Sequence, residues 1–225
     1  MRDDPVKPPA DQRRARGEAR RDRILAVATV YFGRRGYRGS RLVDIAAAAG
    51  VTDAGLLHHF PSKRALFEAV VDRRDSTYSR MELPENVTAR QMLDAYVESV
   101  RDAAGDRDLA RFRSSLSASA QLEGHPAEGH VAKRLELALA GLVPFLNGCR
   151  DRGELRADLD AEQVVLEVLS VNIGLRELWL QLPERVDYPN ALAKAVDGIY
   201  ERIRAVPGVG KDSRPGAPSG ARESA

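Results

Sequence analysis

The sequence predicts an all-α protein of about nine helices, in which a small three-helix unit precedes a larger helical bundle. Nearly every segment between residues 18 and 206 has the three- and four-residue apolar spacing of a helix, and none alternates convincingly as a strand does. The charge also changes along the chain, since residues 1–74 carry a net charge of +7 and the remainder −5. This asymmetry is typical of a protein whose first part meets a polyanion, although a basic tail can also arise by chance.

An apolar stripe and two glycines define the first two expected helices. The stripe of the first helix consists of Ile24, Val27, Ala28, Tyr31 and Phe32. Gly36 is expected to end this helix, and Ser40 stands where the second helix needs an N-cap residue. Gly50 is expected to break the second helix.

The remaining helices follow from caps and breaks further along the chain. Thr52 is expected to cap the third helix, Phe60 and Pro61 to close it, and Ser62 to cap the fourth. Five more helical patterns follow, at residues 88–104, 107–122, 126–151, 160–182 and 189–206. Residues 1–17 and 207–225 contain little that could be buried, which predicts disorder at both ends.

The stretch from Leu42 to Pro61 has the spacing of two short helices that pack at a steep angle. Ala46 supplies a small residue at the close approach, Gly50 permits the turn four residues later, and Leu56 locks the pair six residues beyond that. This is the layout of a helix-turn-helix motif, at about residues 41–60, whose second helix enters the DNA major groove. The alternative is an alanine-rich helical hairpin that has no partner.

Further residues on both sides of this motif agree with a known family at fixed spacing. They are Tyr31-Phe32, Gly36-Tyr37, Asp44-Ile45-Ala46, Ala49-Gly50-Val51, His59-Phe60, Ser62-Lys63 and Leu66-Phe67. On these positions, residues 23–71 resemble the TetR family of bacterial transcriptional regulators. The resemblance implies a homodimer whose two recognition helices enter successive major grooves of a double-stranded DNA operator. It also implies that a small-molecule effector, bound in the helical body, changes the separation of these helices.

The resemblance implies four parts of the chain and a set of DNA-binding residues. The parts are a disordered basic arm at 1–17, a DNA-binding domain at 18–74, a ligand-binding and dimerisation domain at 75–206, and a disordered tail at 207–225. The recognition helix would place Asp53, Ala54 and Gly55 toward base edges. The expected DNA-binding residues are Ser40, Arg41, Thr52, Asp53, Ala54, Gly55, Leu57, His58, His59 and Lys63.

Three positions depart from the family pattern and weaken direct base readout. Leu57 replaces the usual tyrosine and can make only apolar contact, for example with a thymine methyl group. Asp53 is an anion facing a polyanion unless it accepts from a cytosine amino group or caps its own helix. Ala54-Gly55 replaces the usual Gly-Thr pair and removes a hydroxyl. Arginines of the N-terminal arm could compensate by contacting phosphates or a minor groove, the alternative being a solvated arm. They are Arg13, Arg14, Arg16, Arg20, Arg21 and Arg23.

The helical body contains a candidate dimer interface and a candidate effector site. The segment from Val164 to Leu182 is apolar nearly all round, so it must be buried on more than one side. With the last helix it could form a four-helix interface between two copies, the alternative being monomer core. The expected interface residues are Leu169, Ile173, Leu192, Val196, Ile199 and Ile203. Candidate effector contacts, which could equally be plain core or surface, are Tyr96, Phe112, Phe145, Asn172, Arg176 and Trp179.

Other function classes find little support in the sequence. No apolar run reaches the length of a membrane span, and no apolar stretch near the N-terminus has the pattern of a signal peptide, which predicts a cytoplasmic protein. The one cysteine, Cys149, excludes an internal disulfide framework, and the spacing of His125 and His130 does not favour a metal site. No phosphate loop, nucleophile elbow or catalytic triad is present, so neither an enzyme nor a cofactor is expected.

Together these observations predict a ligand-responsive, homodimeric, DNA-binding transcriptional regulator, and more specifically a repressor. The alternative is a helical ligand-binding or protein-interaction protein whose helix-turn-helix no longer recognises a specific DNA sequence.

Overall fold

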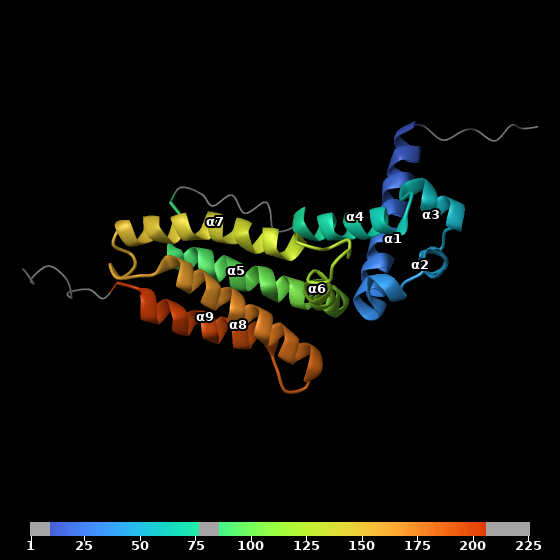
Figure 1. Ribbon diagram of the computed structural model, residues 1–225. Helices are drawn as coiled ribbons and strands as arrows, with labels where there is room; N and C mark the ends of the chain where they lie inside the picture. The colour runs from blue at the N-terminus through green and yellow to red at the C-terminus, as the bar shows by residue number, and fades with distance from the viewer. Residues whose placement is uncertain (1–9, 77–85, 206–225) are drawn as a thin grey trace, which may run out of the picture.

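The computed structural model describes residues 10–76 and 86–205 and confirms the all-α prediction, with nine helices in these two ranges. The first four are α1 (Ala10–Gly39), α2 (Leu42–Ala48), α3 (Asp53–His59) and α4 (Lys63–Ser76). The other five are α5 (Ala89–Ala104), α6 (Arg107–Ser119), α7 (His130–Asp151), α8 (Ala161–Gln181) and α9 (Tyr188–Ile203). Figure 1 shows α5, α7, α8 and α9 side by side as a bundle, with α1 to α4 at one end of it.

Helices α1 to α4 enclose an apolar core, and we call this part of the molecule the head. Helix α1 contributes Ile24, Leu25, Ala28 and Phe32, all buried, while α4 contributes Leu66, Phe67 and Val70 from the opposite side. At Gly36 the helical path of α1 is interrupted, because this residue has φ 67° and ψ 175°. Since only glycine adopts this conformation without strain, Gly36 marks the break that its position in the sequence predicts.

The N-terminal end of α1 corrects one expectation. Residues 10–17 were expected to belong to a disordered arm, yet α1 begins at Ala10. Alanine, arginine and glutamine make up most of this segment, and all three have high helix propensity, so the helix of the head extends through it. The rest of the expected arm, residues 1–9, and the tail 207–225 lie outside the described residues.

Helices α5, α7, α8 and α9 form the second apolar cluster, and with α6 we call them the body. Helix α9 packs its apolar stripe against α5 and α8 of the same chain. Its residues Leu192, Val196, Ile199 and Ile203 are therefore buried in the monomer core, which corrects their assignment to the dimer interface. The physical reason is that α9 is apolar on one face only, and α8, which is apolar nearly all round, supplies the surface that covers it.

Helix α6 joins the head to the body. It packs along α1, and the two backbones come close at Gly33, where an added Cβ would lie 3.0 Å from the backbone nitrogen of Phe112. Phe112 is buried in the core of the head beside Phe67, with ring centroids 6.0 Å apart. The assignment of Phe112 to an effector site is therefore wrong. On the surface, Arg34 of α1 holds Asp108 of α6 through two hydrogen bonds of 3.0 Å.

Within the described ranges no helix combines the length and the apolar character that a membrane span requires.

Candidate nucleic-acid interface

Helices α2 and α3 are joined by a tight turn, as the spacing of small residues predicts. Gly50 lies in this turn with φ 66°, a left-handed conformation that favours glycine. The Val51 amide donates to the Ala46 carbonyl at 3.0 Å and closes the turn. Ala46 and Leu56 are buried against the rest of the head, so the pair is locked in one orientation. The geometry therefore holds α3 as a rigid element on the surface of the head.

The start of α3 is fixed by Thr52, whose capping role is confirmed. Its hydroxyl oxygen accepts from the Gly55 amide at 3.0 Å. A Cβ on Gly55 would lie 3.1 Å from that oxygen, so glycine at this position leaves room for the cap. The equivalent prediction for Ser62 is also confirmed, because its hydroxyl accepts from the Ala65 amide at the start of α4.

The outer face of α3 is exposed and largely without positive charge. Asp53, Ala54, Leu57 and His58 all face solvent, and Leu57 has 44% of its surface exposed. Val43 on α2 is likewise exposed. An exposed leucine and valine on a helix-turn-helix suit apolar contact with thymine methyl groups rather than hydrogen bonding.

Ser40 does not have the role that the sequence predicts for it. The N-cap residue of α2 is Arg41, and no side chain caps this helix. Ser40 is 1% exposed, and its hydroxyl donates to the Gly36 carbonyl at 2.8 Å. The break at Gly36 frees that carbonyl inside the head, and the serine hydroxyl satisfies it. The side chain of Ser40 is therefore turned away from any DNA, and its assignment as a DNA contact is wrong.

Arg41 lies at the start of α2 and is exposed, but it forms an ion pair within the chain. Its guanidinium donates to both carboxylate oxygens of Asp44, at 3.1 and 3.0 Å, and Arg35 reaches the same carboxylate at 3.3 Å. The hydrogen bonds from Arg41 lower the pKa of Asp44 and hold the carboxylate ionised. Two arginines thus share one anion, which leaves an excess of positive charge at this edge of the head.

Lys63 at the start of α4 is half-buried and ties α4 to the end of α1. Its ammonium donates to the Arg38 carbonyl at 3.2 Å and lies 4.7 Å from the centroid of the Tyr37 ring. Burial lowers the pKa of this lysine. An ammonium has three donors, so a phosphate contact is compatible with these two interactions.

His59 and two arginines of α1 meet at the C-terminal end of α3. Burial lowers the pKa of His59, and the positive charges of His58, Arg20 and Arg21 lower it further. The Arg21 guanidinium lies 5.2 Å from the centroid of the Phe60 ring, directly after α3. The N-terminal part of α1 is therefore placed beside the recognition helix, a neighbourhood that the spacing of the sequence did not show.

A separate polar cluster lies inside the body and unites several candidate effector residues. The Asn172 amide on α8 donates to the Tyr96 hydroxyl on α5 at 2.5 Å and accepts from the Tyr188 hydroxyl on α9. Trp179 stacks on Tyr188 with ring centroids 5.6 Å apart. Tyr188 was missed in the sequence because an aromatic residue at the start of a helix has no periodic signal. Phe145 lies on α7 among the partly buried residues of the body.

Arg176 lies one turn of α8 beyond Asn172, and its side chain is only 9% exposed. Its guanidinium donates to Glu177 at 3.1 Å, and the other oxygen of Glu177 accepts from the Ser114 hydroxyl on α6 at 2.6 Å. The Nε atom of Arg176 is buried without a hydrogen-bond partner. A buried cation with an unsatisfied donor is costly, which makes it a candidate contact for a ligand.

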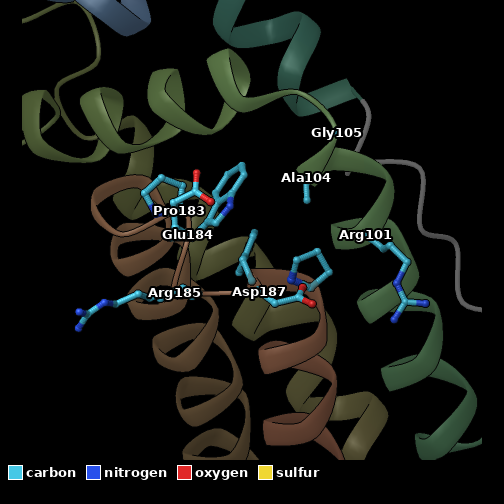
Figure 2. Close-up of a pocket in the computed structure, with 11 residues that line it drawn as sticks. Arg101, Ala104, Gly105, Pro183, Glu184, Arg185 and Asp187 are labelled. Carbon is cyan, nitrogen blue, oxygen red and sulfur yellow. The ribbon is translucent and has the colours of Figure 1, made fainter.

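A cavity of about 540 Å³ opens beside this cluster, where α5 ends and α9 begins. Trp179 and Tyr188 line it together with residues of the α8–α9 loop. Figure 2 shows that the Arg101 and Arg185 side chains extend away on opposite sides, whereas Glu184 and Pro183, which also line the cavity, lie close together.

Comparison with known proteins agrees with this architecture. Residues 24–70 match the family described as "Bacterial regulatory proteins, tetR family". The chain is 30% identical to the "Probable HTH-type transcriptional regulator ArpR" of Pseudomonas putida over 88% of its length and 99% of that protein. It is 29% identical to the HTH-type transcriptional regulator TtgR of Pseudomonas putida, with the same coverage.

Among solved structures, the SmeT–triclosan complex superposes with a TM-score of 0.72 at 20% identity, over 90% of this chain and 100% of SmeT. This likeness concerns the fold. The sequence relatives span the whole body as well as the helix-turn-helix, so the resemblance is not confined to a shared motif. The chain therefore belongs to the TetR family of bacterial transcriptional regulators.

Proposed function

We propose that this transcriptional regulator is a homodimeric repressor that a small-molecule effector releases from its operator. The observation that carries the proposal is the rigid helix α3, which is exposed on the head and flanked by cations. It follows that residues 18–74 form the DNA-binding part and residues 75–206 the effector-binding and dimerisation part. Helix α6 is the connection between the two parts, because its Phe112 is built into the core of the head.

In this proposal α3 lies in the major groove and phosphate contacts supply most of the affinity. Ala54, Gly55 and Leu57 form a small apolar surface that fits against base edges, and Leu57 suits a thymine methyl group. Asp53 accepts from a cytosine amino group, the contact that makes an anion favourable there. His58 is exposed at the end of α3, within reach of a base or a phosphate.

Phosphate contacts fall to residues at the edges of the head. Arg41 supplies an exposed guanidinium, and Lys63 keeps one donor beyond its contacts with Arg38 and Tyr37. His59 is half-buried beside Arg20 and Arg21, and these two arginines add positive charge there. Thr52 contributes by holding the first turn of α3 in place.

The second copy of the chain is proposed to cover the outer face of α8 and α9. Leu166 and Ile173 lie two turns apart on this face of α8 and are 41% and 40% exposed. Gly174 and Gly198 have open space around their Cα atoms, so a partner backbone can approach closely. Leu169 is partly buried at the edge of the same face. Exposed apolar side chains of this size favour burial against another subunit.

The proposed effector site is the polar cluster of the body, formed by Tyr96, Asn172, Arg176 and Trp179. The unpartnered Nε of Arg176 supports it, because a ligand acceptor would satisfy this donor. Glu177 connects Arg176 to Ser114 on α6, and α6 packs on α1 of the head. An effector that binds one arrangement of α6 better than the other would therefore shift the position of the head.

The experiment that tests this proposal is fluorescence-anisotropy binding to DNA flanking the protein's own gene, with scrambled DNA of equal length as the control. The expected result at about 150 mM salt is a preference of a thousandfold or more, with two protomers per site or a multiple of two. Equal and weak binding to both DNAs would contradict the operator-reading role. It would favour a helical ligand-binding protein whose motif has lost sequence recognition.

A further inference from the structure

The first turns of α1 form a helix that projects beyond the head. Figure 1 shows this part of α1 extending past α3 and α4, clear of the bundle. The first side chain of α1 that is buried in the core is Ile24, and residues 18–23 before it are all exposed. A helical segment with no apolar face contributes nothing to the core, so its sequence is free to serve another purpose.

Three arginines of this segment share one side of the helix. Arg16, Arg20 and Arg23 follow the i, i+4, i+7 spacing that aligns side chains along one face of a helix. At 100° per residue, Glu18 and Asp22 fall on the opposite side. Arg14 and Arg21 lie on that second side with the two acids, whereas the first side carries arginines and neither acid, and we call Arg16, Arg20 and Arg23 the basic stripe.

Each acid with a described side chain on this segment has a partner outside the basic stripe. Glu18 accepts from Arg14 at 3.1 Å, and Asp22 accepts from Arg73 of α4 at 3.1 Å through its carbonyl and 3.4 Å through its carboxylate. Arg16, Arg20 and Arg23 form no hydrogen bond or ion pair with the described part of the chain. Three adjacent guanidinium groups that repel one another and lack partners favour the binding of a polyanion.

The position of the basic stripe identifies the polyanion. The guanidinium of Arg21, next to Arg20 in α1, lies 5.2 Å from the centroid of the Phe60 ring directly after α3, and Arg20 itself lowers the pKa of His59 at the C-terminal end of α3. DNA that accommodates α3 in its major groove would therefore continue past this segment. From Arg16 to Arg23 the helix rises about 10 Å, since each residue adds about 1.5 Å. One DNA strand presents a phosphate about every 3.4 Å along the axis, so the stripe matches about three phosphates.

We infer that the N-terminal extension of α1 is a second DNA-binding element, which contacts phosphates outside the half-site occupied by α3 through Arg16, Arg20 and Arg23. This inference rests on the proposed function, because it requires that α3 binds DNA. The contact adds affinity without sequence recognition, which compensates for the weakly charged face of α3.

The test is the salt dependence of binding by the triple variant Arg16→Gln, Arg20→Gln and Arg23→Gln. Glutamine keeps the helix propensity, and none of the three side chains belongs to the core, so the variant should fold as the wild type does. In the wild type each phosphate contact contributes about 0.9 to the slope of log K against log salt. We expect the slope of the dimer to fall by about 5 in the triple variant, with an affinity loss of at least ~tenfold at low salt.

Two matched controls separate this contact from a general effect of charge. The variant Lys133→Gln, Arg152→Gln and Arg156→Gln removes the same charge from exposed positions of the body and should leave the slope unchanged. A DNA duplex trimmed to the two half-sites should bind the wild type and the triple variant of α1 equally. A difference between them on trimmed DNA would place the contact inside the operator and overturn the inference.

An unchanged slope on long DNA, with wild-type preference for the operator intact, would also overturn the inference while the proposed function stands. A wild type with no preference for any operator would instead be a failure of the proposed function, and the two failures are therefore distinguishable.

Discussion

The head and the body of this molecule are both helical, yet they use polar residues in opposite ways. The core of the head is made almost wholly of apolar and aromatic side chains, and its buried Ser40 is satisfied by one local hydrogen bond. The body buries Arg176 and partly buries Asn172 on α8, and leaves three large apolar side chains of that helix exposed. A rigid DNA-binding part needs a core with one packing arrangement. A part that binds a ligand and a partner needs polar groups in its interior and apolar groups on its surface.

Helix α6 belongs to the body in sequence and to both parts in space, so it tests this comparison most directly. We expect Phe112→Ala to cost about 3–5 kcal/mol in unfolding free energy, because Phe112 is fully buried between α1, α4 and α6. The matched change Phe145→Ala, on a half-buried side chain of α7, should cost no more than ~2 kcal/mol. Urea denaturation measures both values. If Phe145→Ala proved as costly as Phe112→Ala, the head would not be the more tightly packed part.

Two threonine caps provide a second pair, one in each part. Thr52 caps α3 in the head, and Thr88 caps α5 in the body through a capping box with Gln91. Each Thr→Ala change should cost about 1 kcal/mol of stability, because an amide at the helix start loses its acceptor. Only Thr52→Ala should also weaken DNA binding, since it loosens the first turn of α3. Anisotropy titration of both variants on the same operator measures this, and equal weakening would show that the effect is one of stability alone.

The smallest expected effect is a change of the unfolding free energy with pH, and it depends on a histidine that lies where the head meets the body. His125 follows α6, lies against the Tyr37 and Phe67 rings of the head, and accepts from the Ala127 amide through Nδ1. Burial lowers the pKa of His125, and the charge of Arg38 lowers it further. The pKa in the folded state is thus below the ordinary value of 6.5, so the unfolded chain takes up a proton first as the pH falls.

Stability is accordingly complete above pH 6.5 and declines as the pH falls below that value. His125→Asn keeps an oxygen acceptor for the Ala127 amide and removes the titrating group, so its unfolding free energy should vary less between about pH 7.5 and about pH 5 than that of the wild type. Parallel curves for the two proteins in chemical denaturation would contradict the assignment.

Much of the head can be predicted from the sequence because its signals are local. The small residue Ala46, the glycine at position 50 and the caps Thr52 and Ser62 each act within one or two helical turns, and each has its expected role in the structure. The departures of Leu57 and Asp53 from the family pattern are equally visible in the sequence, and both side chains are exposed as expected.

The roles that only the tertiary structure decided depend on which surface covers which. An apolar stripe shows that a helix has a face to bury, but not whether the covering surface belongs to the same chain or to a partner. The assignment of the α9 stripe (Leu192, Val196, Ile199 and Ile203) to the interface is wrong for this reason. The same applies to Phe112, which is covered by the head, and to Ser40, whose hydroxyl is engaged by the carbonyl freed at Gly36. The sequence by itself determined the order of the helices, the caps Thr52 and Ser62 and the family. Packing across α1, α6 and α8 decided which side chains remain available to DNA, effector or partner, because contacts between distant segments leave no periodic trace in the chain.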